Sequence, residues 1–152
     1  MGSAFHAKVL RDSHVTLKAM IRLEMVGYFT KAQPYSTWPL YLTYPRSGDF
    51  VVVVGRWEDR FLTGDIKKSF RGATRVPALS YTAPRGIGAD LSDHRNYWAL
   101  GSAVMITDTA YMRNPNYHQA TDVPVTLDYR QMAGVVDGVM SAVVRLANAE
   151  GP

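Results

Sequence analysis

The chain has 152 residues, of which 47% are hydrophobic and 20% are charged, and its formal net charge is +4. These values suit one globular domain with a hydrophobic core and argue against wholesale disorder. The chain has no cysteine, which excludes disulfide bonds, thiolate catalysis and cysteine zinc clusters. A metal ion would therefore have to be held by His, Asp or Glu side chains.

Several classes of partner are not expected from the sequence. The 17 basic residues are scattered along the chain and do not form a stripe, so nucleic-acid binding is not predicted. No apolar run approaches the length of a membrane span, and the N-terminus lacks the basic-then-apolar pattern of a secretory signal. The expectation is a soluble, cytoplasmic protein with no membrane partner.

The first third of the chain predicts a helix, a strand and a long loop. Ser3 can cap a helix that runs to about Arg11. Over 15–25 apolar side chains fall on every second position, which predicts a strand that is buried on one face. Gly27 is expected to allow a turn, and the proline-rich stretch 31–48 is expected to be a loop.

The middle of the chain predicts a buried strand, a helix and a short strand. The run FVVVVG (50–55) is continuously apolar, as in strands that are buried on both faces. Residues 57–70 have apolar side chains on roughly one side, which predicts a helix that Gly72 would end. A short strand is expected around 79–82, followed by a loop rich in Gly and Pro.

The last third predicts two helices around another buried strand. Ser92 is expected to begin a short helix that Gly101 ends, and AVMIT (103–107) is a second continuously apolar strand. Residues 127–148 keep a 3.6-residue apolar period, which predicts a long helix. This alternation of helices and strands predicts an α/β fold, in which helices cover a sheet.

Three polar side chains are expected just beyond strand ends, where functional groups of α/β sheets gather. Glu24 ends the first predicted strand, Asp108 ends the AVMIT strand, and His118 lies in the loop after it. Their spacing alone leaves simpler interpretations open. His118 could be an ordinary surface or hydrogen-bonded residue, and Glu24 could pair with a nearby Arg or Lys.

Four segments carry a more specific pattern: LEMVGY (23–28), LSDH (91–94), TDTA with RNPNYH (107–118) and DVPVTLDY (122–129). Together they resemble the di-zinc aminopeptidases, which are metallopeptidases of family twenty-eight and are related to glutaminyl cyclases. The resemblance runs from about Gly2 to Val144, in order and with compatible spacing. It implies a truncated three-layer α/β/α sandwich with a central mixed sheet, as in the zinc exopeptidases.

The resemblance also implies roles for four residues. Glu24 falls where the family places a carboxylate that ligates one zinc ion, and His118 where it places a histidine that ligates the other. Tyr117 matches a residue that helps to stabilise the tetrahedral oxyanion, and Asp93 matches a hydrogen-bonding carboxylate beside the active centre. Carboxylate and neutral imidazole are suitable zinc ligands. Tyr117 could instead serve only in packing, and Asp93 could cap the helix that begins near it.

Part of the family's site has no counterpart here. A complete member carries, further upstream, a His and a bridging Asp in a His-x-Asp segment, followed by adjacent glutamates that supply a ligand and the general base. The early histidines of this chain are His6 and His14, and no such pattern surrounds them. Residues 1–152 are therefore interpreted as one domain that corresponds to the C-terminal half of the catalytic domain. Catalytic zinc sites ordinarily use about three protein ligands.

Three functional interpretations follow from this incomplete site. The first is an aminopeptidase-like protein with weak or no peptidase activity as a lone chain, whose zinc site would need stand-in ligands such as Asp93, His94 or Asp108. The second is a non-catalytic binding or assembly module with a peptide or amino-acid ligand. The third is one half of a split aminopeptidase.

Two further expectations concern surfaces. A sheet that lacks its other half would leave a bare strand edge and uncovered apolar helix faces, which predicts a homo-oligomer, most simply a two-fold dimer. Aromatic residues of the long loop and its approach could line a pocket for an apolar residue, or could cover the core around that loop. They are Tyr28, Phe29, Tyr35, Trp38, Tyr41 and Tyr44.

Overall fold

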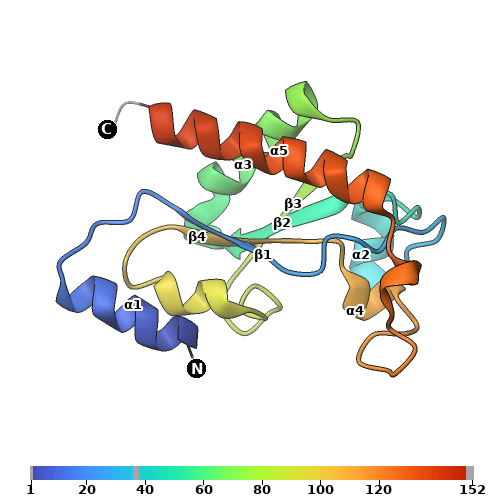
Figure 1. Cartoon of the computed structure of the whole chain (residues 1–152), viewed down its shortest axis with the longest axis horizontal. Helices are drawn as coiled ribbons and strands as arrows, with labels where there is room; N and C mark the ends of the chain where they lie inside the picture. The colour runs from blue at the N-terminus through green and yellow to red at the C-terminus, as the bar shows by residue number, and fades with distance from the viewer. Residues whose placement is uncertain (1, 36–37, 150–152) are drawn as a thin grey trace.

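A computed structural model describes residues 2–35 and 38–149 (Figure 1). The strands are β1 (Met20–Leu23), β2 (Val51–Arg56), β3 (Ala78–Ala83) and β4 (Ala103–Thr107). The α-helices are α1 (Gly2–Asp12), α2 (Trp38–Thr43), α3 (Arg60–Ala73), α4 (Ala110–Arg113) and α5 (Tyr129–Asn148). Three short 3₁₀ helices are η1 (Trp57–Asp59), η2 (Asp93–Tyr97) and η3 (Pro124–Thr126).

The four strands form one mixed sheet in the order β1-β4-β2-β3. β1 runs parallel to β4, and β2 runs parallel to β3, whereas β2 and β4 are antiparallel. The carboxyl ends of β1 and β4 therefore lie at the same edge of the sheet. This arrangement confirms the predicted α/β fold with a central mixed sheet.

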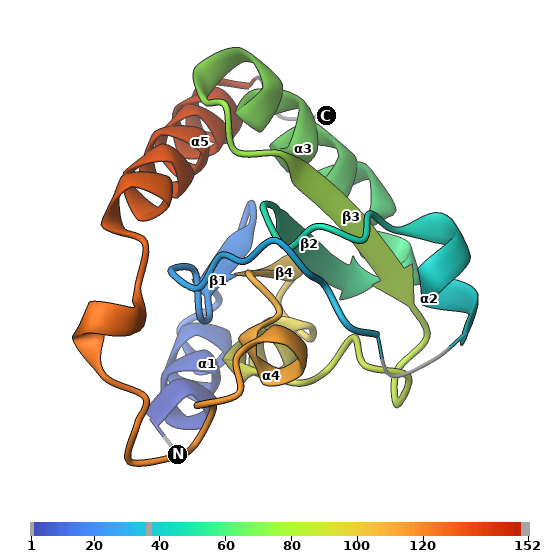
Figure 2. The same ribbon diagram turned by 90° about the vertical axis from the view of Figure 1, so that its right-hand side faces the viewer.

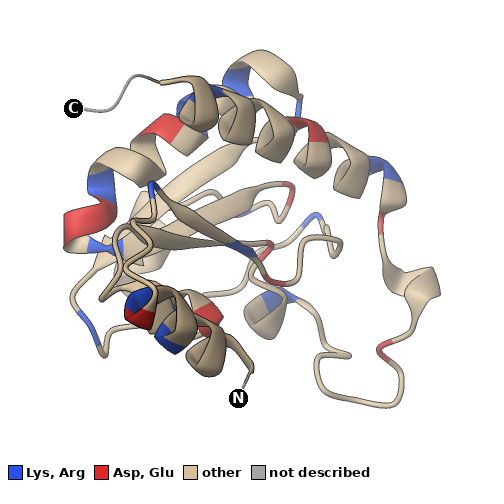
Figure 3. Cartoon of the chain, turned by 60° about the vertical axis from the view of Figure 1, so that its left-hand side comes forward, with Lys and Arg blue, Asp and Glu red and all other residues tan. Residues whose placement is uncertain are grey.

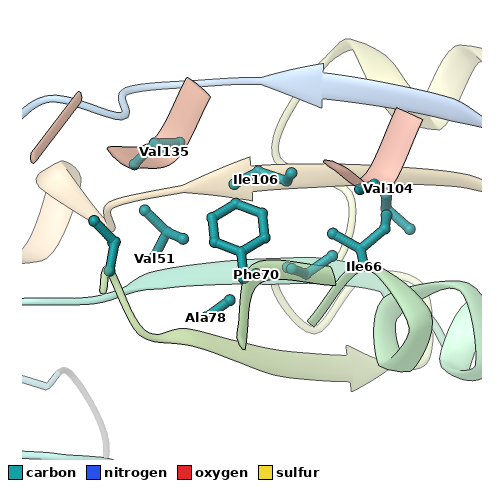
Figure 4. Packing of buried hydrophobic residues seen from close by; sticks show 10 residues of the cluster. Val51, Ile66, Phe70, Ala78, Val104, Ile106 and Val135 are labelled. Atoms are coloured by element: carbon teal, nitrogen blue, oxygen red, sulfur yellow. The ribbon is translucent and has the colours of Figure 1, made fainter. Parts of the chain in front are cut away.

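Helices α3 and α5 cover one face of the sheet and enclose the larger core. Phe70 of α3 is fully buried and lies among side chains of the sheet and of α5 (Figure 4). The core includes Val51, Val53, Ile66, Val104, Ile106 and Val135. The apolar runs at 50–55 and 103–107 thus form the two inner strands, β2 and β4, as their continuous hydrophobicity predicts.

The opposite face of the sheet is covered by α1, α4 and η2 together with long loops (Figure 2). Beneath β4 and β1, Ala7 of α1 packs in a cluster with Tyr97, Trp98 and Ala103. Beneath β2 and β3, the buried side chains belong largely to the strands themselves and to the loop around Ala89. The fold is therefore an α/β/α sandwich whose second helical layer is partly replaced by loops.

Strand β1 is shorter than the sequence pattern predicts. The alternation over 15–25 suggested eleven residues, but only Met20–Leu23 form a strand. The reason is the partner strand, because Met20 pairs with Ala103, the first residue of β4. Leu17, which precedes β1, instead packs into the cluster around α1 and η2.

Three local predictions were wrong. The proline-rich loop contains the short helix α2, in which Pro39 occupies the first turn, where a missing N–H breaks no helical bond. Gly72 does not end α3, which continues to Ala73 before the extended Thr74. Ser3 lies within α1, and its hydroxyl donates to Asp93 rather than capping the helix.

Gly27 does not have a positive φ, and it packs closely against α5. A Cβ atom at this position would lie 2.7 Å from the sulfur of Met132 in α5. The absence of a side chain here allows α5 to lie close to the segment after β1.

Basic and acidic positions are interspersed along α3 and α5 (Figure 3).

Within residues 2–35 and 38–149, no helix is long and apolar enough to cross a membrane.

Candidate functional site

Glu24 lies at the edge of the sheet where β1 ends. Its backbone N–H donates to the carbonyl oxygen of Ile106 over 3.0 Å, which continues the ladder between β1 and β4 by one residue. The side chain is 33% exposed. Its Oε2 atom accepts hydrogen bonds from the Ser92 hydroxyl (2.8 Å) and from Nη2 of Arg22 (3.2 Å). The pairing of Glu24 with a nearby arginine, which the sequence left open, is therefore present.

Asp93 lies beside Glu24 and is held by α1. Its Oδ1 accepts a 2.7 Å hydrogen bond from the Ser3 hydroxyl, and Oδ2 lies 3.9 Å from Nε of Arg22. Asp93 does not cap η2, whose N-cap residue is Ser92. A cleft of about 400 Å³ is lined by Glu24, Asp90, Leu91, Ser92, Asp93 and Arg95. The structure thus brings Glu24 and Asp93 together, with Arg22 between them.

Asp108 follows β4 at the same edge, but its carboxylate is used for backbone contacts. The residue is 1% exposed, and its oxygens accept hydrogen bonds from the N–H groups of Tyr28 (2.6 Å) and Ala110 (2.7 Å). Burial raises the pKa of Asp108 to about 6, although these hydrogen bonds and the nearby Arg113 oppose the change. Asp108 therefore joins the segment after β1 to the start of α4, and it is poorly placed to stand in as a metal ligand.

His94 is fully buried and packs edge-on against Trp98. Its Nε2 atom lies 2.7 Å from the carbonyl oxygen of Ala89, so Nε2 must carry the proton. Burial lowers the pKa of His94 and favours the neutral ring. The His94 side chain therefore stabilises the 89–94 loop, and His94 would have to leave the core to coordinate a metal ion.

His118 and Tyr117 lie in the loop after α4 (Figure 1). His118 is exposed, has a left-handed φ of 59°, and stacks on the Tyr117 ring with 3.9 Å between centroids. The backbone before this loop is anchored by Arg113, whose Nε donates to Gln33 over 2.6 Å and whose Nη1 donates to Gly48 over 2.7 Å.

No three His, Asp or Glu side chains among residues 2–35 and 38–149 come together in a group that could hold a metal ion. Both oxygens of Asp93 already face protein donors. A catalytic zinc ion ordinarily takes about three protein ligands, so these residues by themselves do not fit one. The assignment of Glu24 and His118 as ligands stays a prediction.

An apolar cavity of about 350 Å³ lies beneath β2 and β3, on the face opposite α3 and α5. Its lining includes Tyr35, Leu40, Tyr44, Phe50, Val52, Val54, Tyr81, Ile87, Leu91, Tyr111 and Met112. Leu91 also lines the Glu24 cleft, so the two hollows adjoin. We refer to this space as the aromatic cavity.

The sequence revealed only part of the aromatic cavity. Tyr35 and Tyr44 lie in its lining, as one of the two sequence interpretations allowed, and the Tyr44 hydroxyl donates to the carbonyl oxygen of Ser80 over 2.8 Å. Trp38, in contrast, is 73% exposed. The contributions of Tyr81 and Tyr111 were missed. The available signal was the alternation of Phe50, Val52 and Val54, which face the side of the sheet without a long covering helix.

Comparison with solved structures shows which known fold this chain resembles. The chain matches part of an aminopeptidase fold, since 99% of it superposes on 36% of the LapA aminopeptidase of Legionella pneumophila, with a TM-score of 0.71 and 19% identity. LapB of the same organism gives a TM-score of 0.72 at 17% identity, with 97% of this chain and 36% of that chain covered. In sequence, the chain is 41% identical over 146 residues to the uncharacterized protein YfbL of Escherichia coli K12.

The match to YfbL covers 93% of this chain and 44% of that protein, so the chain spans less than half the length of this relative. No protein-family model matches the sequence.

Proposed function

We propose that this chain forms the substrate-binding side of an aminopeptidase-type domain, and that the aromatic cavity holds the apolar side chain of an amino acid or short peptide. The proposal rests on one observation, the cavity of about 350 Å³ that adjoins the Glu24 cleft. Small-molecule pockets have volumes of roughly 300–1,000 Å³ and are mostly apolar with a few polar groups. Beside the cavity, Glu24, whose side chain is 33% exposed, offers a carboxylate to the amino group of such a ligand.

The binding proposal predicts that leucinamide binds more tightly than glycinamide. Tyr111 lines the cavity and is 42% exposed, so removal of its ring would open one wall without emptying the core. We expect Tyr111→Ala to weaken leucinamide binding by about tenfold, which corresponds to about 1.4 kcal/mol. Ligand-induced NMR shift changes measure the affinity.

Tyr129→Ala is the matched control, because Tyr129 is 60% exposed on α5 and lies on the opposite face of the sheet. Its affinity for leucinamide should equal that of the unmodified chain. Equal weakening by both substitutions, or equal binding of leucinamide and glycinamide, would contradict the assignment of the cavity.

A second candidate function is one half of a split metallo-aminopeptidase. It is favoured by the extent of the structural match, which covers about a third of the LapA chain. In this form Glu24 and His118 would each contribute to a zinc centre whose other ligands and general base come from another polypeptide. A general base contributes about 10²–10⁴-fold to the rate of such a reaction.

The split-enzyme hypothesis predicts that the purified chain with zinc releases p-nitroaniline from leucine p-nitroanilide no faster than zinc-containing buffer. Adding a polypeptide that carries the His-x-Asp and paired-glutamate segments should produce chelator-sensitive hydrolysis, which Glu24→Ala or His118→Ala should each reduce by at least ~10²-fold. Hydrolysis that both variants leave unchanged would show that the inherited residues are not responsible.

The proposal also includes a homo-oligomer, most simply a two-fold dimer. Support comes from the outer side of α5, where Val136, Met140, Val143 and Val144 are each about half exposed and repeat at helical spacing. β1 is an edge strand of the sheet as well. A non-catalytic binding or assembly module would use the same surfaces.

A further inference from the structure

Arg22 is placed to act on both carboxylates of the Glu24 cleft. It lies in β1 two residues before Glu24, and alternate residues of a strand point to the same face of the sheet. Its Nη2 atom donates to Glu24 Oε2 over 3.2 Å, and its Nε atom lies 3.9 Å from Asp93 Oδ2. The Nε atom is buried and makes no hydrogen bond to any of the residues that the structure describes. One guanidinium group is therefore shared between two acidic side chains.

The neighbouring groups hold this arrangement in place. Ser92 donates to the same oxygen of Glu24 that Arg22 contacts, at 2.8 Å. Ser3 donates to the other oxygen of Asp93, and Asn96 donates to Ser3 over 2.9 Å. Both carboxylates are thus fixed by hydroxyl donors from separate parts of the chain, on either side of Arg22.

We propose that the positive charge of Arg22 partly neutralises the Glu24 and Asp93 carboxylates, and that its guanidinium group competes with divalent metal ions for Glu24. This inference deepens the proposed function, because it assumes that Glu24 is an inherited metal ligand. Arg22 already donates to Oε2 of Glu24, and a metal ion on either oxygen of this carboxylate would lie close to the positive charge of Arg22, which is unfavourable.

The surroundings of the cleft become more negative when Arg22 is replaced. Asp90 and Arg95 also line the cleft, and Arg22 contacts Glu24 and Asp93 of its lining, so two arginines accompany three carboxylates. Arg22→Gln leaves one arginine against three carboxylates. Carboxylates without a paired cation attract hard divalent ions such as Mn²⁺.

Paramagnetic broadening of backbone NMR signals by Mn²⁺ tests the proposal, because it locates weak metal binding residue by residue. In the full chain with Arg22→Gln, the signals of Glu24 and Asp93 should broaden at a Mn²⁺ concentration at least ~10-fold lower than in the unmodified chain. Arg22→Met removes the same charge with an apolar stem and should behave as Arg22→Gln does. Arg22→Lys keeps the charge and should stay close to the unmodified chain.

Lys68→Gln is the matched control, since Lys68 forms an exposed 3.2 Å ion pair with Asp65 on α3. Its effect on the Glu24 signal should be negligible. If the two charge-removing variants broaden at the same Mn²⁺ concentration as the unmodified chain, Arg22 does not compete and the inference is wrong. That result would leave the test of the aromatic cavity with leucinamide unaffected.

The double variant Arg22→Gln/Glu24→Gln separates the inference from the function on which it rests. If the double variant broadens no more than the unmodified chain, the extra Mn²⁺ broadening of Arg22→Gln depends on Glu24, which supports competition for Glu24. Persistence of broadening at Asp93 alone would show that the gain does not involve Glu24, which contradicts the competition and also removes support for Glu24 as a metal ligand. Leucinamide binding is measured independently, so the two failures can be told apart.

Discussion

Replacement of Phe70 by alanine is expected to lower the free energy of unfolding by about 3–5 kcal/mol. The ring is fully buried between the sheet and α5, with Val51, Ile106 and Val135 in the same cluster (Figure 4). Gly138 of α5 lies so close that a Cβ atom there would be 2.5 Å from Cδ1 of Phe70. Gly138 has no side chain to move into the space, so the cavity would stay largely unfilled. Urea unfolding followed by circular dichroism measures the loss.

Phe61 provides the matched control for this substitution. It lies on the same helix, α3, but its side chain is 71% exposed. Phe61→Ala should change the free energy of unfolding by no more than about 0.5 kcal/mol. Similar losses for both variants would mean that Phe70 is not packed as this fold requires.

Protonation of Asp108 is expected to give the chain an unusual dependence of stability on pH. Burial raises the pKa of this carboxyl in the folded chain from 3.8 to about 6. Between these values the folded state holds the proton more tightly than the unfolded state does. The contribution of Asp108 is thus fully present below about pH 4 and is lost as the pH rises through 6, a change of about 3 kcal/mol.

The measurement is urea unfolding at several pH values between 4 and 8, for the unmodified chain and for Asp108→Asn. The variant cannot titrate at this position, so the difference between the two profiles isolates the Asp108 contribution. His94 has the opposite sign, because burial lowers its pKa, but it is present in both proteins and cancels in the difference. Parallel profiles would show that Asp108 does not titrate in this range.

Parts of the candidate site could be predicted from sequence, and parts could not. The position of Glu24 at a strand end followed from the alternating pattern before it, and that of Asp108 from the buried run before it. Strand ends of an α/β sheet are where functional groups gather. The hydrogen-bond partners of Glu24 and Asp108 could not be predicted from the sequence. The Asp108 carboxylate turns to the N–H groups of Tyr28 and Ala110, and Glu24 pairs with Arg22, because segments distant in the chain meet there.

The sequence by itself determined the central elements of this protein. The apolar runs that become β2 and β4, and the 3.6-residue period of α5, indicate the correct structure because the hydrophobic pattern of each segment reflects the face it buries. Tertiary structure alone decided the length of β1, the strand order and the aromatic cavity. A strand extends only as far as its partner, and the walls of a cavity come from elements whose distances are set by packing.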